Sequence, residues 1–399
     1  MTTRAATRSG QSAGWDAIVV GARVSGASTA LLLAQAGWRV LVVDRARRGS
    51  DTLSTHALMR GGVLQLQRWG LLDQVEAAGT PPVRRVTFHY GADCLPVSLK
   101  PNSGVDALYA PRRTVLDSVL VGAAENAGAS IRLRVSVTDL TYDSTGRVDG
   151  VVLRDRFGAT RVERAPLVIG ADGRSSIVAE RVGAPTISAG SHTAAFAYGY
   201  WPAADLDGYH WYYGDALSAG VIPTNDGLAC VFVGGPPAVL DAAMRQRRPA
   251  ESQRELLGRI DGGLVDLTAT PPVGSVRFFR GMPSLLRRPY GRGWALVGDA
   301  GCWKDPLSTH GITAALHDAE LLATAVVGRD PDTAGDLALS DYQEQRDRTA
   351  AQLHPIADRL ASHQWNLDEV RRLLHGMASV MADEVEAIRE LDAQPLPTA

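Results

Sequence analysis

One short stretch near the start of the chain restricts the fold more than any other part of the sequence. The apolar run 15–20 predicts a strand, and a glycine-bearing turn follows over 21–26. The Ala- and Leu-rich run 27–36 then predicts a helix, and a second apolar strand over 38–43 ends in Asp44. A strand, tight turn, helix and strand within roughly 30 residues indicate a βαβ unit and hence a parallel sheet in an α/β fold.

The glycine turn has part of the sequence expected of a dinucleotide-binding site. Gly21 supplies the tight turn, and Gly26 lets the helix pack closely on the sheet. Arg23 replaces the glycine that normally admits a pyrophosphate, so its side chain is a candidate charge partner for that group. Asp44 stands 23 residues after Gly21, where a carboxylate accepts hydrogen bonds from ribose hydroxyls. A generic βα turn is the alternative, and Arg45 belongs either to a phosphate-binding cluster or to a solvated basic loop.

The remaining chain indicates a second, sheet-rich domain inserted into the first. From 188 to 279, short β-type runs alternate with Gly, Pro and Asp, and beyond 340 the periodicity is mostly helical. We therefore expect a discontinuous nucleotide-binding domain over 15–187 and 280–339, an inserted substrate domain over 188–279 and a helical region over 340–399.

Charge and composition exclude several classes of protein. The 41 basic residues against 43 acidic ones argue against a nucleic-acid binder. Three widely spaced cysteines predict neither a disulfide framework nor a metal site. No apolar run approaches the ~18 residues that span a bilayer, and residues 1–14 resemble a disordered polar leader without a secretory signal. We expect a soluble cytoplasmic protein with no transmembrane segment, whose oligomeric state the sequence leaves open.

Two further acidic turns follow apolar strands. Asp172 and Gly173 follow the run 167–169, and Asp299 follows the run 294–297. A carboxylate at a strand end can bind a hydroxyl of a sugar-like chain. A helix that starts near Gly311 would direct its free N–H groups at whatever lies in front of it.

Three segments, in order, carry a family resemblance: GARVSGA from Gly21, IGADGRSS from Ile169 and GDAGCWKDPLSTHG from Gly298. Together they resemble flavoprotein monooxygenases of the para-hydroxybenzoate hydroxylase fold, a group related to geranylgeranyl reductase-like enzymes and halogenases. The resemblance implies an FAD-binding Rossmann-like domain, an inserted β-sheet substrate domain and a helical C-terminal tail. It also implies FAD as cofactor and oxidoreductase activity, although Arg23 departs from the usual glycine pattern.

The resemblance carries FAD contacts over to individual residues. Asp299 matches the ligand of the ribityl chain, Val137 a backbone contact to adenine, and Arg60 an arginine near the pyrophosphate. Pro306 and Gly311 match the loop and helix start beside the isoalloxazine ring. The full set of expected FAD contacts is Gly21, Arg23, Gly26, Asp44, Arg45, Arg60, Arg113, Val137, Asp172, Gly173, Asp299, Pro306, Gly311 and Ile312.

The chemistry expected of such a site belongs mainly to the flavin. The positive end of a helix at Gly311 would stabilise reduced flavin and favour a C4a-hydroperoxide, which a dry apolar pocket protects. His310 and His56 lie in flavin-proximal segments. Each is a candidate proton donor or acceptor. The alternative is that each is a loop histidine whose ring is only hydrogen-bonded to backbone.

A dense aromatic cluster in the inserted domain supplies the candidate substrate contacts Tyr198, Tyr200, His210 and Tyr212. Because side chains alternate along a strand, His210 and Tyr212 share one face and the aromatic residues beside them share the other. Sheet core or a dimer surface is the alternative. If these residues bind substrate, a bulky aromatic or polycyclic molecule is favoured.

The leading hypothesis is an FAD-dependent monooxygenase that hydroxylates or epoxidises an apolar, aromatic or polycyclic small molecule in specialised metabolism. A flavin-dependent reductase of prenyl-type double bonds is the alternative, ahead of a halogenase, whose lysine and WxWxIP segment are not visible, and of a non-catalytic flavin-fold binding protein. No second glycine fingerprint follows a strand. NADH or NADPH would therefore bind transiently, or a separate flavin reductase would supply the electrons.

Overall fold

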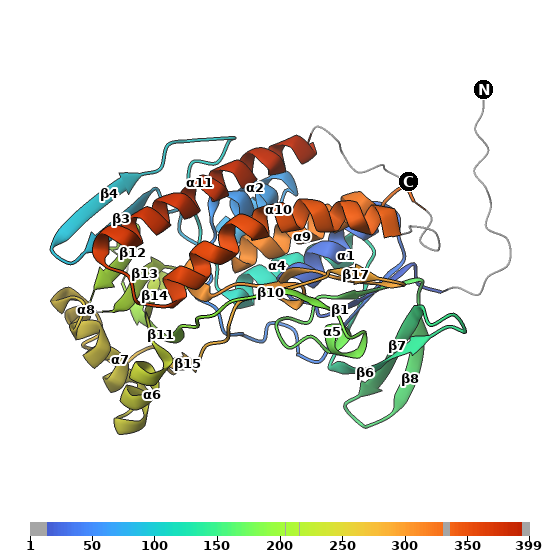
Figure 1. Cartoon of the computed structure of the whole chain (residues 1–399), viewed down its shortest axis with the longest axis horizontal. Coiled ribbons are helices and arrows are strands. Elements are labelled where there is room, and N and C mark those ends of the chain that lie inside the picture. Colours follow the sequence, from blue (N-terminus) through green and yellow to red (C-terminus); the bar gives the residue numbers. More distant parts are fainter. Residues whose placement is uncertain (1–13, 204, 215, 330–335, 393–399) are drawn as a thin grey trace.

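The structure, a computed structural model, describes residues 14–203, 205–214, 216–329 and 336–392. The leader expected over 1–14 therefore lies outside the described residues, apart from its last position. Within them the chain forms a six-stranded sheet, a seven-stranded sheet and two three-stranded sheets, with helices between and around them (Figure 1). The α/β fold with a largely antiparallel substrate-side sheet and C-terminal helices is the one predicted.

The six-stranded sheet has the order β17-β18-β9-β1-β2-β5 and is parallel from β18 to β5. All four residues of β1 are buried, as expected of a central parallel strand. Successive residues face opposite layers, so that Val19 packs with the helices and Ile18 packs against a small sheet. The strands are β1 (Ala17–Val20), β2 (Val40–Asp44), β5 (Ser130–Leu133), β9 (Leu167–Gly170), β17 (Tyr290–Gly291) and β18 (Trp294–Leu296).

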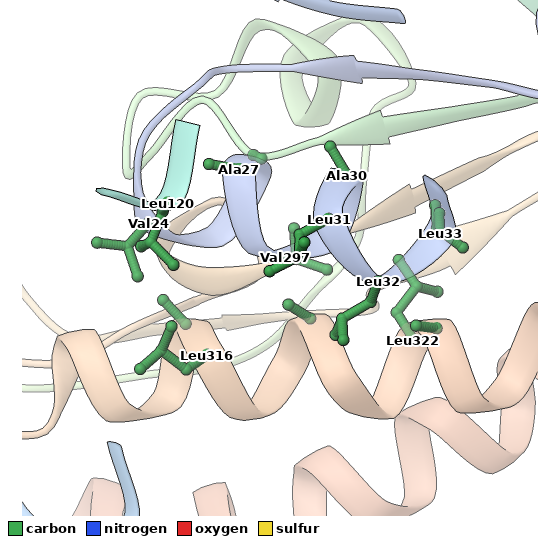
Figure 2. Packing of buried hydrophobic residues seen from close by; sticks show 14 of the residues in the cluster. Val24, Ala27, Ala30, Leu31, Leu32, Leu33, Leu120, Val297, Leu316 and Leu322 are labelled. Atoms are coloured by element: carbon green, nitrogen blue, oxygen red, sulfur yellow. The ribbon is translucent and has the colours of Figure 1, made fainter. Parts of the chain in front are cut away.

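Helices cover one face of this sheet, and α1 (Val24–Gln35) is the most enclosed of them. Its residues 24–34 are all buried, which explains why small and apolar residues occur on every side of this helix. Figure 2 shows Leu32 of α1 facing Leu322 of α9 (Gly311–Val326), while Leu120 of α4 (Arg113–Asn126) lies near Val24. The layer is completed by α2 (Arg60–Arg68) and α3 (Leu72–Ala77).

A three-stranded antiparallel sheet covers the other face. It consists of β6 (Val135–Tyr142), β7 (Val148–Asp155) and β8 (Thr160–Arg164). The short helix α5 (Ile177–Arg181) follows β9 and packs beside it.

The cysteines in the described part of the chain are free thiols, and no helix there is long and apolar enough to cross a membrane.

The seven-stranded sheet has the order β15-β11-β14-β13-β12-β3-β4. The range 188–279 supplies β11 to β15, but β3 and β4 come from the earlier part of the chain, and β3 runs parallel to β12. The predicted domain boundaries did not place that earlier hairpin in this sheet. The strands are β3 (Arg85–Tyr90), β4 (Asp93–Ser98), β11 (Ala195–Pro202), β12 (Tyr209–Gly214), β13 (Leu217–Pro223), β14 (Leu228–Gly235) and β15 (Arg277–Phe279).

Each face of the large sheet has its own helical cover. The three helices α6 (Pro237–Gln246), α7 (Pro249–Gly258) and α8 (Gly262–Leu267) pack on one face. The C-terminal helices α10 (Asp336–Ala361) and α11 (Leu367–Asp392) pack on the face that looks toward the six-stranded sheet. A small sheet of β10 (Thr186–Ala189), β16 (Leu285–Arg287) and β19 (Cys302–Trp303) joins the two halves.

Candidate functional site

A cavity of about 840 Å³ runs from the carboxyl ends of the central parallel strands to the large sheet. Carboxyl ends of parallel strands are where α/β folds bind ligands. Most of the predicted contacts line it. They are Gly21, Arg23, Asp44, Arg45, His56, Arg113, Val137, Asp172, Gly173, Tyr198, Asp299, Pro306, Gly311 and Ile312. The cavity lining does not include Gly26, Arg60, Tyr200, His210, Tyr212 or His310.

Two glycines of the first turn are required by the packing around them. Gly21 has φ +106°, and a Cβ there would lie 2.4 Å from the carbonyl oxygen of Ala171. A Cβ on Gly26 would lie 1.9 Å from the carbonyl oxygen of Gly21. Gly21 therefore shapes the cavity wall directly, whereas Gly26 supports the turn from behind.

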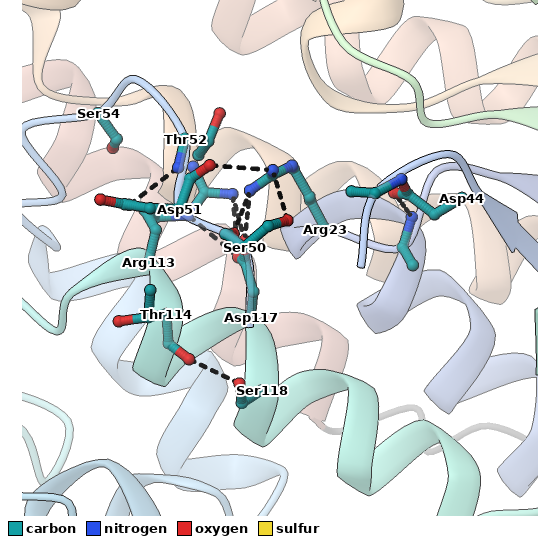
Figure 3. A network of polar contacts seen from close by, with 12 residues as sticks. Arg23, Asp44, Ser50, Asp51, Thr52, Ser54, Arg113, Thr114, Asp117 and Ser118 are labelled. Carbon is teal, nitrogen blue, oxygen red and sulfur yellow. Dashed lines mark hydrogen bonds and ion pairs between the residues drawn. The ribbon is translucent and has the colours of Figure 1, made fainter. Parts of the chain in front are cut away.

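Arg23, the unusual residue of the turn, is held in a polar network (Figure 3). Its φ of −91° is one that any residue adopts, so the backbone does not require glycine here. Nη1 lies 3.0 Å from Oδ2 of Asp117 on α4, and the guanidinium also donates to the carbonyl oxygens of Ser50 and Asp51, both at 3.3 Å. Arg113 pairs with the same Asp117 at 2.9 Å. Arg23 thus ties the turn to the 50–51 loop and α4 while it lines the cavity.

Two acidic residues at strand ends brace backbone beside the cavity. Asp44 accepts hydrogen bonds from the N–H groups of Ala22 at 2.7 Å and Ala46 at 2.6 Å, and so fixes the turn and the loop after β2. Oδ2 of Asp172 accepts from the N–H of Ile177 at 2.7 Å. Its buried Oδ1 has no hydrogen-bond partner in the described part of the chain, which leaves an acceptor for a ligand.

Asp299 lies in the turn after β18, on the cavity wall. Burial raises its pKa to about 6, although the positive charges of Lys304, Arg113 and Arg174 act in the opposite direction. A ligand hydroxyl that donated to this carboxylate would favour its ionised form.

The start of α9 faces the cavity, but the side chain before it does not. Gly311, Ile312 and Ala315 line the cavity, so free N–H groups of the first turn are directed at it. His310 is 1% exposed, and its Nε2 lies 2.6 Å from Oε2 of Glu384 on α11. This imidazole is turned toward the C-terminal helix rather than toward the cavity.

His56 lies on the cavity wall and is held by the large sheet. Its Nε2 lies 3.1 Å from the hydroxyl of Tyr200 on β11. Burial, together with the charges of Arg112 and Arg113, lowers the pKa of His56 to about 3, so the ring is neutral near neutral pH. The hydroxyl of Tyr198 is bonded to residues of the same loop, accepting from the N–H of Ser54 at 3.2 Å. The two tyrosines therefore anchor the 52–56 loop beside the cavity.

Three further candidates are placed elsewhere. Arg60 donates to the carbonyl oxygen of Val105 at 2.8 Å and so fastens the loop before α4. His210 is bonded to Asp207 at 2.8 Å, and Tyr212 packs on the face of the large sheet that carries α6 to α8. Tyr198 and Tyr200 belong to the opposite face, so the structure does not bring the four substrate candidates together.

Arg174, Trp303 and Phe279 are among the cavity residues that were not singled out from the sequence. Arg174 directly follows the Asp172–Gly173 turn, and Trp303 lies within the third motif, so their neighbours in sequence could have indicated them. Phe279 reaches the cavity because β15 pairs with β11, and no local pattern shows that pairing.

Residues 15–356 match the family model described as "FAD binding domain". The chain belongs to this family. Menaquinone reductase of Mycolicibacterium smegmatis is 29% identical over 333 residues, covering 77% of this chain and 75% of the relative. Digeranylgeranylglycerophospholipid reductase 1 of Methanococcoides burtonii is 25% identical over 330 residues, covering 79% and 76%.

Among solved structures, PqsL, a probable FAD-dependent monooxygenase from Pseudomonas aeruginosa, is similar with a TM-score of 0.75. It is 22% identical, and the match covers 92% of this chain and all of that one. At this identity the likeness shows the fold, which is the para-hydroxybenzoate hydroxylase fold predicted from the motifs. The chain is an FAD-dependent oxidoreductase.

The cavity fits FAD on independent structural grounds. Its volume is about 840 Å³, it begins at the required glycine turn, and it offers Oδ1 of Asp172, a buried acceptor with no partner among the described residues. Asp44 and Val137 lie at the wall formed by β2 and β6, while Pro306 and Gly311 lie at the start of α9. Bound FAD would supply two-electron redox chemistry to this site.

Proposed function

We propose that this flavoenzyme is a monooxygenase that hydroxylates or epoxidises a compact aromatic or other planar apolar molecule. One atom of O2 enters the substrate and the other leaves as water. NADH or NADPH, directly or through a separate reductase, supplies the two electrons that the substrate does not provide.

The aromatic end of the cavity carries the proposal. Phe196 and Tyr198 of β11, Phe279 of β15 and Trp303 of β19 all line that end, near the wall made by the start of α9. Aromatic walls favour a planar apolar reactant, because ring contacts add to the burial of apolar surface.

The space beyond this end favours a compact substrate over a long one. Between the large sheet and the C-terminal helices lie buried side chains such as Tyr209, Tyr213, Leu360 and Trp365. An extended isoprenoid chain would need that space as a channel. The closed packing therefore supports a reactant that ends near the aromatic wall.

Residues of this chain have three tasks in such a reaction. The N–H groups at the start of α9 stabilise negative charge that develops in front of them. Apolar side chains at the aromatic end exclude water from the reacting atoms. Neutral His56, held at Nε2 by Tyr200, presents a ring that orients a polar group of the substrate rather than a strong base.

A prenyl-type reductase is the second candidate, because the names of the two curated relatives above are those of reductases. Such an enzyme saturates a double bond with two electrons and two protons and needs no O2. The two proposals therefore differ in their requirement for oxygen.

The test begins with FAD-loaded protein mixed anaerobically with NADH and, separately, with NADPH while the visible flavin absorbance is followed. ¹⁸O2 is then admitted in the presence of a panel of aromatic substrates and of geranylgeraniol. Coupled O2 consumption with one ¹⁸O atom in an aromatic product supports the proposal. Anaerobic saturation of geranylgeraniol, with no labelled product from any aromatic substrate, contradicts it and supports the reductase.

A further inference from the structure

Arg174 occupies an aromatic corner at the substrate end of the cavity. Its guanidinium carbon lies 5.0 Å from the ring centre of Phe279 and 5.5 Å from that of Trp303. The two rings meet edge to face, with centres 5.9 Å apart and planes at 77°. These residues come from the turn after β9, from β15 and from β19, and all three line the cavity. The corner therefore depends on the packing of three segments, from the six-stranded sheet, the seven-stranded sheet and a small sheet, against one another.

The N–H groups of Arg174 have no partner among the residues that the structure describes. A guanidinium has five N–H donors. In the described residues the contacts of the Arg174 side chain are those with the two rings, and it has neither a hydrogen bond nor an ion pair there. Among the other arginines on or near the cavity, Arg23 and Arg113 pair with Asp117, and Arg277 pairs with Asp51. Arg45 and Arg154 on the cavity wall resemble Arg174 in having no ion pair within the described residues. What sets Arg174 apart from those two is the pair of aromatic rings that holds it, and within the described residues its charge is available to a ligand.

The corner favours one class of ligand group. Stacking on two aromatic rings holds the guanidinium in place without consuming its donors, since cation–π contacts act through the ring faces. The fork of N–H groups then matches the paired oxygens of a carboxylate or a phosphate. Phe279 and Trp303 extend as an apolar wall beside that fork. An apolar ring that bears an acidic group fits both features.

Arg174 also lies close to the expected flavin contacts. It follows Gly173 directly, and its charge acts on Asp299, the residue matched to the ribityl chain. An anion held here would place the attached apolar part against Phe279, Trp303 and the neighbouring wall. That arrangement uses the same end of the cavity as the proposed reaction.

We propose that Arg174 recognises an anionic oxygen group, a carboxylate or phosphate, on the molecule that reacts at this site. The inference rests on the proposed function and narrows its substrate class to planar apolar acids. The same chemistry has a second source, the phosphate groups of the nicotinamide donor, and the experiment separates the two.

The test uses FAD-loaded protein and four forms of the chain: wild type, Arg174→Met, Arg174→Lys and Arg280→Met. Arg280 is the matched control, since it follows Phe279 directly but is exposed and pairs with Asp241. FAD content is measured first. Each form is then titrated with 2-naphthoate, its neutral isostere 2-naphthamide, and NADPH, with the flavin absorbance as readout.

The expected result is a roughly ten-fold or larger loss of 2-naphthoate affinity in Arg174→Met, because a charge-assisted bidentate contact is removed. Affinity for 2-naphthamide stays unchanged, Arg174→Lys falls between, and Arg280→Met matches the wild type. A loss confined to NADPH assigns the anion to the electron donor and overturns the narrowing of the substrate class to planar apolar acids.

Several results overturn the inference. The first is an equal loss of affinity for 2-naphthoate and 2-naphthamide in Arg174→Met, and the second is an unchanged affinity for both 2-naphthoate and NADPH. The third is a wild type whose flavin absorbance responds to neither 2-naphthoate nor NADPH. The fourth is loss of FAD from Arg174→Met but from no other form. The last would make Arg174 a cofactor ligand. Failure of the proposed function shows separately in the ¹⁸O2 assay, as anaerobic saturation of geranylgeraniol without a labelled aromatic product, whether or not the titrations depend on Arg174.

Discussion

Glu384 of α11 joins the C-terminal helix to α9 through two buried imidazoles. Its Oε2 lies 2.6 Å from His310 Nε2 and its Oε1 lies 3.0 Å from His317 Nδ1. The side chain of Glu384 is 2% exposed, that of His310 is 1% exposed and that of His317 is 8% exposed. We predict that Glu384→Leu strongly destabilises the fold, because it leaves both imidazoles buried without their acceptor.

The size of the loss follows from this burial. Removing one partner of a buried ion pair costs about 3–5 kcal/mol. Glu384→Gln keeps the shape and one acceptor oxygen but loses the charge and puts an NH2 donor against one imidazole, so we expect a smaller loss of about 1–3 kcal/mol. Glu386→Gln is the control on the same helix. Its pair with Arg389 is more than half exposed, and we expect a change below about 0.5 kcal/mol.

The loss of folding stability in Glu384→Leu should depend on pH. Burial opposes a charge on His317, but the hydrogen bond and negative charge of Glu384 outweigh it and raise the pKa of His317 above its ordinary 6.5. A raised histidine pKa contributes stability fully below 6.5, and this is lost as the pH rises through the folded-state value. Burial would raise the pKa of Glu384, yet the two imidazoles lower it, so its contribution is present above its ordinary 4.5 and is lost on acidification. The variant should therefore differ most from the wild type between these two values.

The assay is urea unfolding followed by tryptophan fluorescence at about pH 5.5, inside that window, and at about pH 9, above it. We expect a larger gap between wild type and Glu384→Leu at the lower pH. A loss no larger than that of Glu386→Gln, or one equal at both pH values, would refute the reasoning.

Three further predictions concern the cofactor end of the cavity. Asp299→Ala should lower FAD content more than it lowers the melting temperature of the FAD-free protein, since its carboxylate is placed to bind ligand; equal losses would indicate a structural carboxylate. Arg23→Gly restores the usual glycine but removes the pair with Asp117, so we expect a loss of about 1 kcal/mol in urea unfolding with unchanged FAD content; lost FAD at unchanged stability would contradict this. Gly26→Ala should cost about 3 kcal/mol or more, because its Cβ would lie 1.9 Å from a carbonyl oxygen. Gly122→Ala, at a helix position with open space, should be neutral or stabilising, and similar effects of both changes would count against the close packing.

Local patterns were sufficient to predict the fold class and the family. The βαβ unit at 15–44 is visible because its strand, glycine turn and helix are contiguous, and the structure contains it as β1, α1 and β2. The two later acidic turns are also contiguous with their strands. The carboxyl ends of parallel strands then bring Gly21, Asp172 and Asp299 to one cavity.

Features that depend on distant segments were not predictable in this way. His310 lies at the expected helix start, but its direction is set by Glu384, a residue 74 positions later. The alternation along β12 showed which residues share a face, yet nothing local showed that His210 and Tyr212 lie on the face away from the cavity. Such orientation is decided by which helices cover each face of the sheet.

The composition of the seven-stranded sheet has a consequence for engineering. Because β3 lies parallel to β12 and carries β4 on its other side, residues 85–98 and 209–214 form one continuous surface. A chimera that exchanges only 188–279 with a relative would pair a foreign β12 with a resident hairpin. Recombination between family members should keep both stretches from the same parent.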